Sequence, residues 1–288
     1  MIGKALRIIL VFLGHIIKDC FFIIGVASSI LTILYLVNLD SMGFIQRHQF
    51  RFFVISLIAA VGLIAKNLPH LFFKIKMKIP NVNSQVIIRY GDILKSKNDI
   101  CLATNNFLNI EPKDINPDGI LAKIIDEEKN VCSIENELEL NIRERHGYEL
   151  KRNKLGEEIP AYKPGSVGYF TRKNGKKLYL MVISDVVYPN PMPSFESKKE
   201  YVGLALNSLW SRLRSSGNNK PLSMPVIGTG TSNARKSNYM AILDICDSFI
   251  TESGKGKIID ILEIIIHKNK LSMRQFYLLN KTLKEITK

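Results

Sequence analysis

The chain has 288 residues, of which 40 are Lys or Arg and 26 are Asp or Glu, so its formal net charge is +14. Because 46% of the residues are hydrophobic and only four are cysteine, the composition excludes a disordered chain, a collagen-like chain and a disulfide-dense domain. Half of the net charge, +7, falls in residues 1–78, where apolar residues are densest. The sequence shows no nucleic-acid-binding motif, so we interpret this charge as juxtamembrane and expect no nucleic-acid partner.

Two apolar stretches near the start predict membrane helices. Residues 20–39 carry no charge, and as a helix they would extend about 30 Å, the thickness of the hydrocarbon layer of a bilayer. A second span is predicted over about residues 52–73, although the uncharged part, 52–65, covers only about 21 Å. Lys66 would then have to reach the interface and Pro69 to kink the helix, so an interfacial helix is the alternative.

The basic side chains around these stretches predict the orientation of the chain. They precede the first span and follow the second, which favours both ends in the cytoplasm, and the first apolar stretch is unlike a cleaved signal peptide. We therefore expect residues 1–78 to be a membrane segment with two transmembrane helices, in a multi-pass protein of the cell inner membrane. After the linker Ile79-Pro80-Asn81, residues 82–288 are expected to form a cytoplasmic domain. The four cysteines have no zinc spacing, which suits this location.

Strand and helix patterns alternate in the second part of the chain. Strands are predicted at residues 85–89 and 100–103, and a helix over 118–126 with Asp118 as its N-cap. Residues 135–154 are charged and weakly patterned, so no element is assigned there. Further on, an Asn174-Gly175 turn joins strands at 167–171 and 177–184, and apolar spacing predicts a helix within 197–216.

The last third of the chain continues this alternation. A strand at 222–227 leads into a glycine-containing loop, and a helix is predicted from about Ser237. A strand at 257–266 precedes a last helix that begins with a capping box of Ser272 and Gln275. Together the elements predict an α/β domain with three layers, a sheet between two layers of helices.

The segment 224–232, MPVIGTGTS, is the most specific feature of the chain. Gly228 and Gly230 allow backbone conformations in which successive N–H groups converge on a phosphate, and the following helix adds the positive end of its dipole. Arg235 lies within reach of an anion there, although a solvated helix start would also explain it. The loop is neither a Walker motif nor GxGxxG, and a simple glycine turn is the alternative.

The order of the motifs resembles the macro domain, the ADP-ribose-binding fold, over most of residues 85–266. A strand is followed by Gly91-Asp92-Ile93, a buried strand ends in Asn105-Asn106, and a Gly-Thr-Gly loop precedes a helix. In that family the acidic residue of the first turn accepts a hydrogen bond from the adenine amino group. The resemblance therefore implies this role for Asp92, with Ile93 packing nearby; closing a turn is the alternative role of Asp92.

The same resemblance implies contacts to the rest of the nucleotide. The family's Asn-Ala-Ala-Asn motif looks like Ala103-Thr104-Asn105-Asn106, so Asn106 would contact the distal ribose, and a loop pair is the alternative for the two asparagines. The Gly-Thr-Gly loop would hold the diphosphate. The predicted ligand-binding residues are Asp92, Ile93, Asn105, Asn106, Asp118, Gly119, Gly228, Thr229, Gly230, Thr231, Ser232, Asn233 and Arg235.

The chain departs from the macro-domain pattern at two positions. The first phosphate loop, usually three glycines before a helix, reads NPDGI at residues 116–120 and has one glycine. The aromatic residue that often follows the Gly-Thr-Gly loop is replaced by residues 233–235, NAR. Because hydrolysis by macro domains depends on that glycine loop and on a positioned water, we expect binding without catalysis. No catalytic residue, metal site or cofactor is predicted, and the five histidines have no metal or triad spacing.

Two transmembrane helices before a divergent macro domain are similar to the membrane-bound effectors of type II Thoeris anti-phage systems. That resemblance implies a receptor for an ADP-ribose-derived signal, described for such systems as histidine-ADP-ribose, which a TIR-domain enzyme makes from NAD upon infection. It also implies ligand-induced homo-oligomerisation, disruption of the lipid bilayer and cell death. Two alternatives stay open: a membrane-anchored ADP-ribosyl hydrolase acting on modified protein or nucleic acid, and an anchored domain that binds a protein partner and no nucleotide.

Overall fold

The computed structural model describes residues 74–80, 82–108, 110, 119–128, 131–153, 155–188, 194–217, 219–229, 237–267 and 270–286. The chain divides after residue 72, and residues 73–288 form one compact unit, to which the whole description refers. Both predicted transmembrane helices lie outside the described residues. Within the described ranges, no helix combines the length and the hydropathy needed to cross a membrane.

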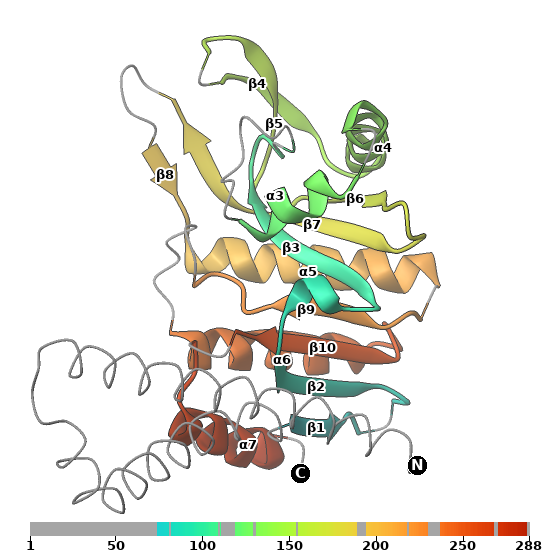
Figure 1. Cartoon of the computed structure of the whole chain (residues 1–288), viewed down its shortest axis with the longest axis vertical. Helices are drawn as coiled ribbons and strands as arrows, with labels where there is room; N and C mark the ends of the chain where they lie inside the picture. Colours follow the sequence, from blue (N-terminus) through green and yellow to red (C-terminus); the bar gives the residue numbers. More distant parts are fainter. Residues whose placement is uncertain are drawn as a thin grey trace, which may run out of the picture. The chain divides into compact units, whose positions relative to one another are not determined.

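A mixed sheet of eight strands forms the centre of the domain (Figure 1). Seven strands follow one another in the order β1 (Lys74–Lys78), β2 (Gln85–Tyr90), β10 (Ile261–Ile266), β9 (Leu222–Pro225), β3 (Asp99–Asn105), β7 (Lys177–Val187) and β6 (Val167–Thr171), and β8 (Ser194–Glu196) pairs with β7. The strands from β2 to β7 in this order are parallel, whereas β1, β6 and β8 are antiparallel to their neighbours. The carboxyl ends of the parallel strands therefore share one edge of the sheet.

Helices cover both faces of the sheet (Figure 1). One core contains α5 (Lys199–Ser216), α6 (Asn238–Ser253) and α7 (Met273–Ile286), and the other contains α3 (Ile120–Asp126) and α4 (Val131–Arg143). Alternate residues of β7 point to the two cores, Tyr179 and Met181 to the first and Leu178 and Leu180 to the second. A strand buried on both faces reads as a continuous apolar run, as KLYLMVIS does. The predicted α/β domain with three layers is confirmed.

The strand β1 lies within the part of the chain that we assigned to the membrane segment. Its sequence, KIKMK, alternates exposed lysines with Ile75 and Met77, which are 5% and 6% exposed in the larger core. Such alternation is typical of a strand at the edge of a sheet with one covered face. The predicted boundary at residue 78 is therefore wrong for Lys74–Lys78, which belong to the domain.

The region to which the sequence analysis assigned no element contains α4 and the first half of a separate hairpin. The hairpin pairs β4 (Tyr148–Arg152) with β5 (Glu158–Tyr162) and projects beyond the main sheet (Figure 1). Among the described side chains of α4, Ile134, Leu138 and Ile142 form a buried apolar row, spaced four residues apart among charged residues. This spacing is typical of an amphipathic helix, so the sequence did carry a signal for α4, which was overlooked among the charged residues of 135–154.

The predicted helix starts at Asp118, Ser237 and Ser272 agree with the structure at two of these three helices, α6 and α7. Ser237 is the N-cap of α6, and its Oγ accepts a hydrogen bond from Met240 N at 3.2 Å. Ser272 and Gln275 form the predicted reciprocal box at the start of α7. The N-cap of α3 is Gly119, without a side-chain bond, and the predicted cap, Asp118, is one residue too early and lies outside the described residues.

Candidate ligand-binding site

The carboxyl edge of the parallel strands carries the predicted binding residues in a row. Asp92 follows β2, Gly228 follows β9, and Asn105 ends β3, so the strand order β2-β10-β9-β3 fixes their sequence along the edge. In open α/β sheets, ligands bind outside this edge. Six predicted residues lie outside the described ranges: Asp118, Gly230, Thr231, Ser232, Asn233 and Arg235.

Asp92 is exposed and caps the short 3₁₀ helix η1 (Ile93–Lys95). Its Oδ1 accepts a hydrogen bond from Leu94 N at 3.0 Å, which holds the carboxylate in place. Ile93, at 5% exposed, packs beneath this turn in the smaller core. Asp92 thus closes a turn, as the alternative explanation predicted, and it also presents a fixed negative group to solvent at the edge of the sheet.

Gly228 lies in the loop after β9 and has a φ of 84°. This left-handed conformation favours glycine over residues with a Cβ, so the prediction of an unusual backbone at Gly228 is confirmed. The loop then leads to α6, whose amino-terminal dipole end favours a negative charge. Thr229 is half-buried beside it.

Asn106 occupies a different environment from the other predicted residues. Its side chain is completely buried and connects β3 to β7: Oδ1 accepts from Val186 N at 2.9 Å, and Nδ2 donates to Val186 O at 3.2 Å and to Asp185 Oδ1 at 2.6 Å. In this structure Asn106 therefore stabilises the edge on which the site is built, and its contact with a ribose stays a prediction.

Asn105 is half-buried at the end of β3. The register between β3 and β7 shifts between Thr104 and Asn105, and Asn105 Oδ1 accepts a hydrogen bond from Phe107 N at 3.0 Å. A bulge of this kind redirects side chains and is common beside functional sites. Of the two asparagines predicted at the ribose position, Asn105 and Asn106, Asn105 is thus the more exposed.

Asp185 is a residue of the site that the sequence did not reveal. It binds Asn106 Nδ2 and also accepts two hydrogen bonds of 3.0 Å from Lys151 Nζ on β4. The carboxylate therefore joins the hairpin to the edge of the sheet. No local pattern indicates this contact, because Lys151 and Asp185 are 34 residues apart and both lie outside the predicted elements.

A cavity of about 360 Å³ opens where β3 ends, between α4 and the β4–β5 hairpin. We call it the hairpin cavity. Its apolar lining includes Phe107, Leu108, Leu138, Ile159 and Tyr162, and its polar lining consists of Glu135, Asn136, Glu139, Asn153 and Glu157. Leu108 has a φ of 53°, which is rare for a bulky residue and is a form of strain found at functional sites. None of these residues was predicted.

The walls of the hairpin cavity are fixed by polar contacts to the sheet. Asn141 of α4 binds both backbone groups of Tyr169 on β6, accepting from its N–H at 2.9 Å and donating to its carbonyl. The buried guanidinium of Arg212 on α5 donates to Asn141 O and to Val167 O, each at 2.8 Å. On the hairpin, Tyr162 N donates to Asn106 O at 2.8 Å. These bonds hold α4 and β5 against the edge of the sheet.

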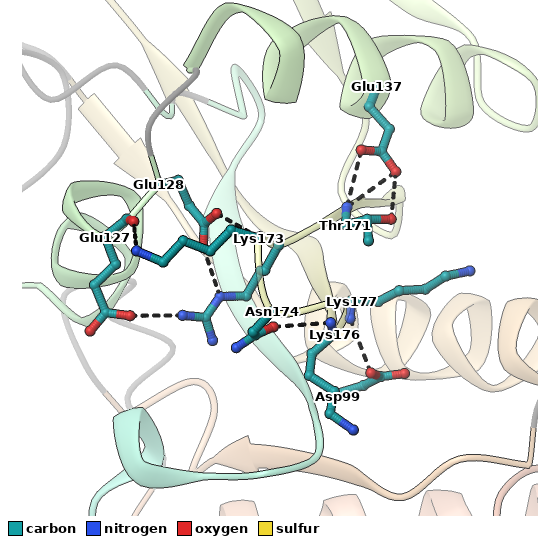
Figure 2. A network of polar contacts seen from close by, with 10 residues as sticks. Asp99, Glu127, Glu128, Glu137, Thr171, Lys173, Asn174, Lys176 and Lys177 are labelled. Atoms are coloured by element: carbon teal, nitrogen blue, oxygen red, sulfur yellow. Dashed lines mark hydrogen bonds and ion pairs between the residues drawn. The ribbon is translucent and has the colours of Figure 1, made fainter.

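A second polar network lies at the opposite, amino-terminal end of β3 and β7 (Figure 2). Arg172 binds Glu128 at 3.1 Å and Glu127 at 3.0 Å, and the side chains of Arg172 and Glu128 are only 5% and 4% exposed. Asp99 accepts a hydrogen bond from Lys177 N at 3.0 Å. The network connects the end of α3 to the β6–β7 turn.

The titratable groups of the described residues offer little else for chemistry. No group of three or more His, Cys, Asp or Glu side chains among them is arranged to hold a metal ion. Cys101 and Cys246 are free and buried, and burial raises the pKa of both thiols, so they are not activated nucleophiles.

Comparisons with known proteins indicate the family to which the chain belongs. Three solved macrodomain structures from Oceanobacillus iheyensis have a similar fold. A point mutant is 15% identical to this chain with a TM-score of 0.49, and the match covers 75% of this chain and 98% of that one. For the macrodomain with ADP the identity is 15%, the TM-score 0.47 and the coverages 74% and 96%, and for a second point mutant with ADPR they are 16%, 0.49, and 74% and 98%. A comparison with curated protein sequences gives no match.

A family match covers most of the described domain. Residues 86–267 match the family described as "Thoeris protein ThsA, Macro domain", which is more than half of the 288 residues and extends from β2 to the residue after β10. The chain therefore belongs to the ThsA macro-domain family.

Proposed function

We propose that this protein is a membrane-bound effector of a Thoeris-type anti-phage system, whose macro domain binds an ADP-ribose-derived signal. The observation that carries the proposal is the row of Asp92, Gly228 and Asn105 along the carboxyl edge of the sheet, in a chain of the ThsA macro-domain family. Macrodomains of similar fold have been solved with ADP and with ADPR.

The geometry suits an extended nucleotide. The exposed Asp92 carboxylate accepts a hydrogen bond from the adenine amino group at one end of the row. In the middle, the backbone after Gly228 and the start of α6 hold the diphosphate. Asn105 meets the distal ribose at the β3 end. A dinucleotide-like ligand that lies along the edge thus meets three groups in order: the Asp92 carboxylate, the backbone N–H groups after Gly228 and the Asn105 side-chain amide.

The proposed protein is a sensor and does not turn over its ligand. Its first phosphate loop has a single glycine, Gly119, where hydrolytic macro domains usually have three. A TIR-domain enzyme supplies the signal from NAD, and histidine-ADP-ribose is the proposed form of that signal. Binding is expected to drive assembly of several copies of the chain.

The membrane part of the proposal depends on residues 20–39 and 52–73, whose sequences predict two spans in the inner membrane. The second predicted span runs directly into β1, an edge strand of the sheet whose carboxyl edge carries the site. Assembly of the cytoplasmic domains therefore brings the spans of several copies together. We propose that this disrupts the bilayer and kills the infected cell.

Titration calorimetry of the full chain in detergent micelles tests the proposal. We expect binding of ADP-ribose or of histidine-ADP-ribose, and a loss of at least about tenfold in affinity in Asp92→Ala, as for removal of a hydrogen bond to a charged group. Asp126→Ala is the matched control, because Asp126 is an exposed aspartate at the end of α3. Failure of the wild type to bind either ligand would refute the proposal, and release of ADP-ribose from a modified substrate would favour the hydrolase.

A further inference from the structure

We propose that the domain binds the anionic phospholipid headgroups of the bilayer through a cluster of basic side chains around β1. We call this cluster the basic face, and it consists of Lys74, Lys76, Lys78, Arg89, Lys95 and Lys97. The proposal rests on the part of the proposed function that places two membrane spans before the domain, and it does not depend on the nucleotide site. It assigns a lipid contact to the folded domain itself.

The three lysines of β1 point to one side of the sheet. In the sequence KIKMK they alternate with Ile75 and Met77, which pack in the larger core, so the lysines are exposed on the opposite face. Among the described residues, the smaller core, which contains α3 and α4, includes no residue of β1 or β2. Figure 1 shows α3 and α4 toward the other end of the sheet. The lysines of β1 therefore face solvent.

Arg89 of β2 extends this row of positive charge. It lies directly opposite Lys74 in the antiparallel pair of β1 and β2, on the same face of the sheet. Like charges in opposite positions of two strands destabilise the pair. Burial, and then the charge of Lys76, lower the pKa of Lys74, and Arg89 adds to this shift. The arrangement is thus unfavourable by itself, and a layer of negative charge would relieve it.

The segment between β2 and β3 adds two exposed lysines, Lys95 and Lys97. It crosses the sheet on the side of the β1 lysines, because Asn98 Nδ2 donates to Glu263 Oε2 at 3.3 Å and the same carboxylate pairs with Arg89 at 2.6 Å. The basic face therefore extends from the edge strand over β2 and this segment.

The acidic side chains beside the basic face leave its lysines free. Glu263 is 9% exposed and is already paired with Arg89. Asp260, just before β10, pairs with Lys257 at 2.5 Å, and Asp92 caps η1 at the carboxyl edge. Among the described residues, none of the five lysines of the basic face takes part in an ion pair. These lysines are therefore available to an external anion.

The place of β1 in the chain selects a lipid surface as that anion. The second predicted span ends at residue 73 and β1 starts at Lys74, so no linker separates them. Lys78 lies at most about 13 Å along the strand from Lys74, a distance comparable with the Debye length of about 8 Å at physiological salt. Basic segments directly beside a span are attracted to the anionic lipids of the cytoplasmic leaflet.

Lysines on an edge strand also have a simpler explanation, which is protection against pairing with another chain. That explanation accounts for the charges of β1, but it requires none on β2 or on the segment that follows. A lipid contact accounts for all of them, and the two explanations predict different responses to the composition of the bilayer.

Lysine labelling of the full chain in lipid nanodiscs tests the contact. The discs contain phosphatidylcholine alone or equal parts of phosphatidylcholine and phosphatidylglycerol, and mass spectrometry follows acetylation of each lysine. We expect the five lysines of the basic face to react about fivefold more slowly in the anionic discs, the factor that corresponds to about 1 kcal/mol per lysine at an anionic surface. Lys220, exposed before β9, should react equally fast in both.

Two further conditions identify the source of the protection. In about 1 M salt, where the Debye length is only about 3 Å, the difference between the discs should disappear. Inorganic phosphate added to the neutral discs should not slow the labelling of the basic face. Protection by phosphate equal to that by phosphatidylglycerol would show a site for small anions and would overturn the lipid contact.

A triple variant tests whether the basic face acts as a unit. In Lys74→Gln/Lys76→Gln/Lys78→Gln we expect Lys95 and Lys97 to react equally fast in both kinds of disc. Removing like charges from neighbouring positions should leave the melting temperature unchanged or slightly higher, which excludes an effect of misfolding. The matched control is Lys199→Gln/Lys220→Gln/Lys255→Gln, which removes three exposed lysines outside the basic face and should keep the protection.

The outcomes separate this proposal from the proposed function. If the wild type stays with both kinds of disc and the lysines of the basic face react equally fast in both, the lipid contact is wrong while the proposed function stands. A chain that stays with neither kind of disc would contradict the predicted spans, and with them the membrane part of the proposed function and the lipid contact together.

Discussion

At the scale of single residues, Gly228 has a backbone conformation that a side chain would oppose. Its φ of 84° lies in the left-handed region, where a residue with a Cβ costs about 1–2 kcal/mol. We expect Gly228→Ala to lower the free energy of unfolding by this amount in urea denaturation and to weaken ADP-ribose binding. Gly203→Ala is the control, because a Cβ at this exposed position of α5 meets no atom within 4 Å. It should raise stability by about 0.5–1 kcal/mol, and equal effects of the two variants would contradict the role of the backbone at Gly228.

His146 makes the stability of the domain depend on pH. Burial, and then the charges of Arg212 and Arg145, lower the pKa of His146 below its usual 6.5, and Val167 N donates to its neutral Nε2 at 3.4 Å. The unfolded chain therefore binds a proton more readily than the folded one. The contribution of neutral His146 to the free energy of unfolding is fully present above pH 6.5. It is lost as the pH falls from 6.5 through the lowered pKa of His146 in the folded protein.

This pH dependence is measurable by urea denaturation at pH 7.5 and pH 5.5. We expect the wild type to lose more stability between these two values than His146→Gln, whose amide keeps an acceptor for Val167 N–H without titrating. Identical losses in the two proteins would show that His146 does not have a lowered pKa in the folded state.

At the scale of elements, the Arg172 network holds α3 to the β6–β7 turn (Figure 2). Arg172→Met leaves the buried carboxylate of Glu128 without its cation, and breaking a buried pair in this way costs about 3–5 kcal/mol. Lys163→Met is the control, because both side chains of the Lys163–Glu149 pair are more than half exposed and the pair should contribute less than about 1 kcal/mol. The double variant Arg172→Met/Glu128→Met should recover part of the loss in urea denaturation. A loss below about 1 kcal/mol in Arg172→Met would contradict the burial of the pair.

The elements that the sequence predicted are those whose determinants are local. The Asn174-Gly175 turn places Gly175 at a φ of 74°, and Ser237 and Ser272 cap the helices that directly follow them. By contrast, α4 is held by Asn141 contacts to Tyr169, 28 residues away, and by Arg212, 71 residues away. Contacts of this kind leave no signal in the local sequence, and the apolar row of Ile134, Leu138 and Ile142 was overlooked among charged residues.

The same distinction applies to the site. Asp92 and Gly228 were predicted because each follows a strand in a short motif, and both lie at the expected edge of the sheet. The hairpin cavity was not predicted, because the loop after β3, α4 and the hairpin come together only in the folded domain. Asn106 was predicted from a motif as a ligand contact, yet the structure shows that its amide binds β7, a partner that is 80 residues away.

At the scale of the whole molecule, a signal bound at the edge of the sheet has to change the contacts of other parts of the protein in order to have an effect. Tyr90, the last residue of β2, is next to the Gly91-Asp92 turn. Its hydroxyl donates to Leu271 O at 3.0 Å, and its ring stacks on Phe276 of α7 at 5.1 Å. α7 in turn contacts β1, which directly follows the second predicted span in the sequence. Tyr90 is therefore the residue through which we expect signal binding and assembly of the full chain to be coupled.

Tyr90→Phe tests this coupling, because it removes the bond to Leu271 O and keeps the ring stacked on Phe276. We expect the variant to bind histidine-ADP-ribose within about threefold of the wild type, since a neutral hydrogen bond outside the site contributes only about 1 kcal/mol. Its conjugate-induced shift to larger assemblies, measured by light scattering in detergent, should be reduced. Tyr277→Phe is the control, because Tyr277 is 68% exposed on α7. Equal assembly of Tyr90→Phe and the wild type would place the coupling elsewhere, whereas a wild type that binds the conjugate without assembling would contradict signal-driven assembly itself.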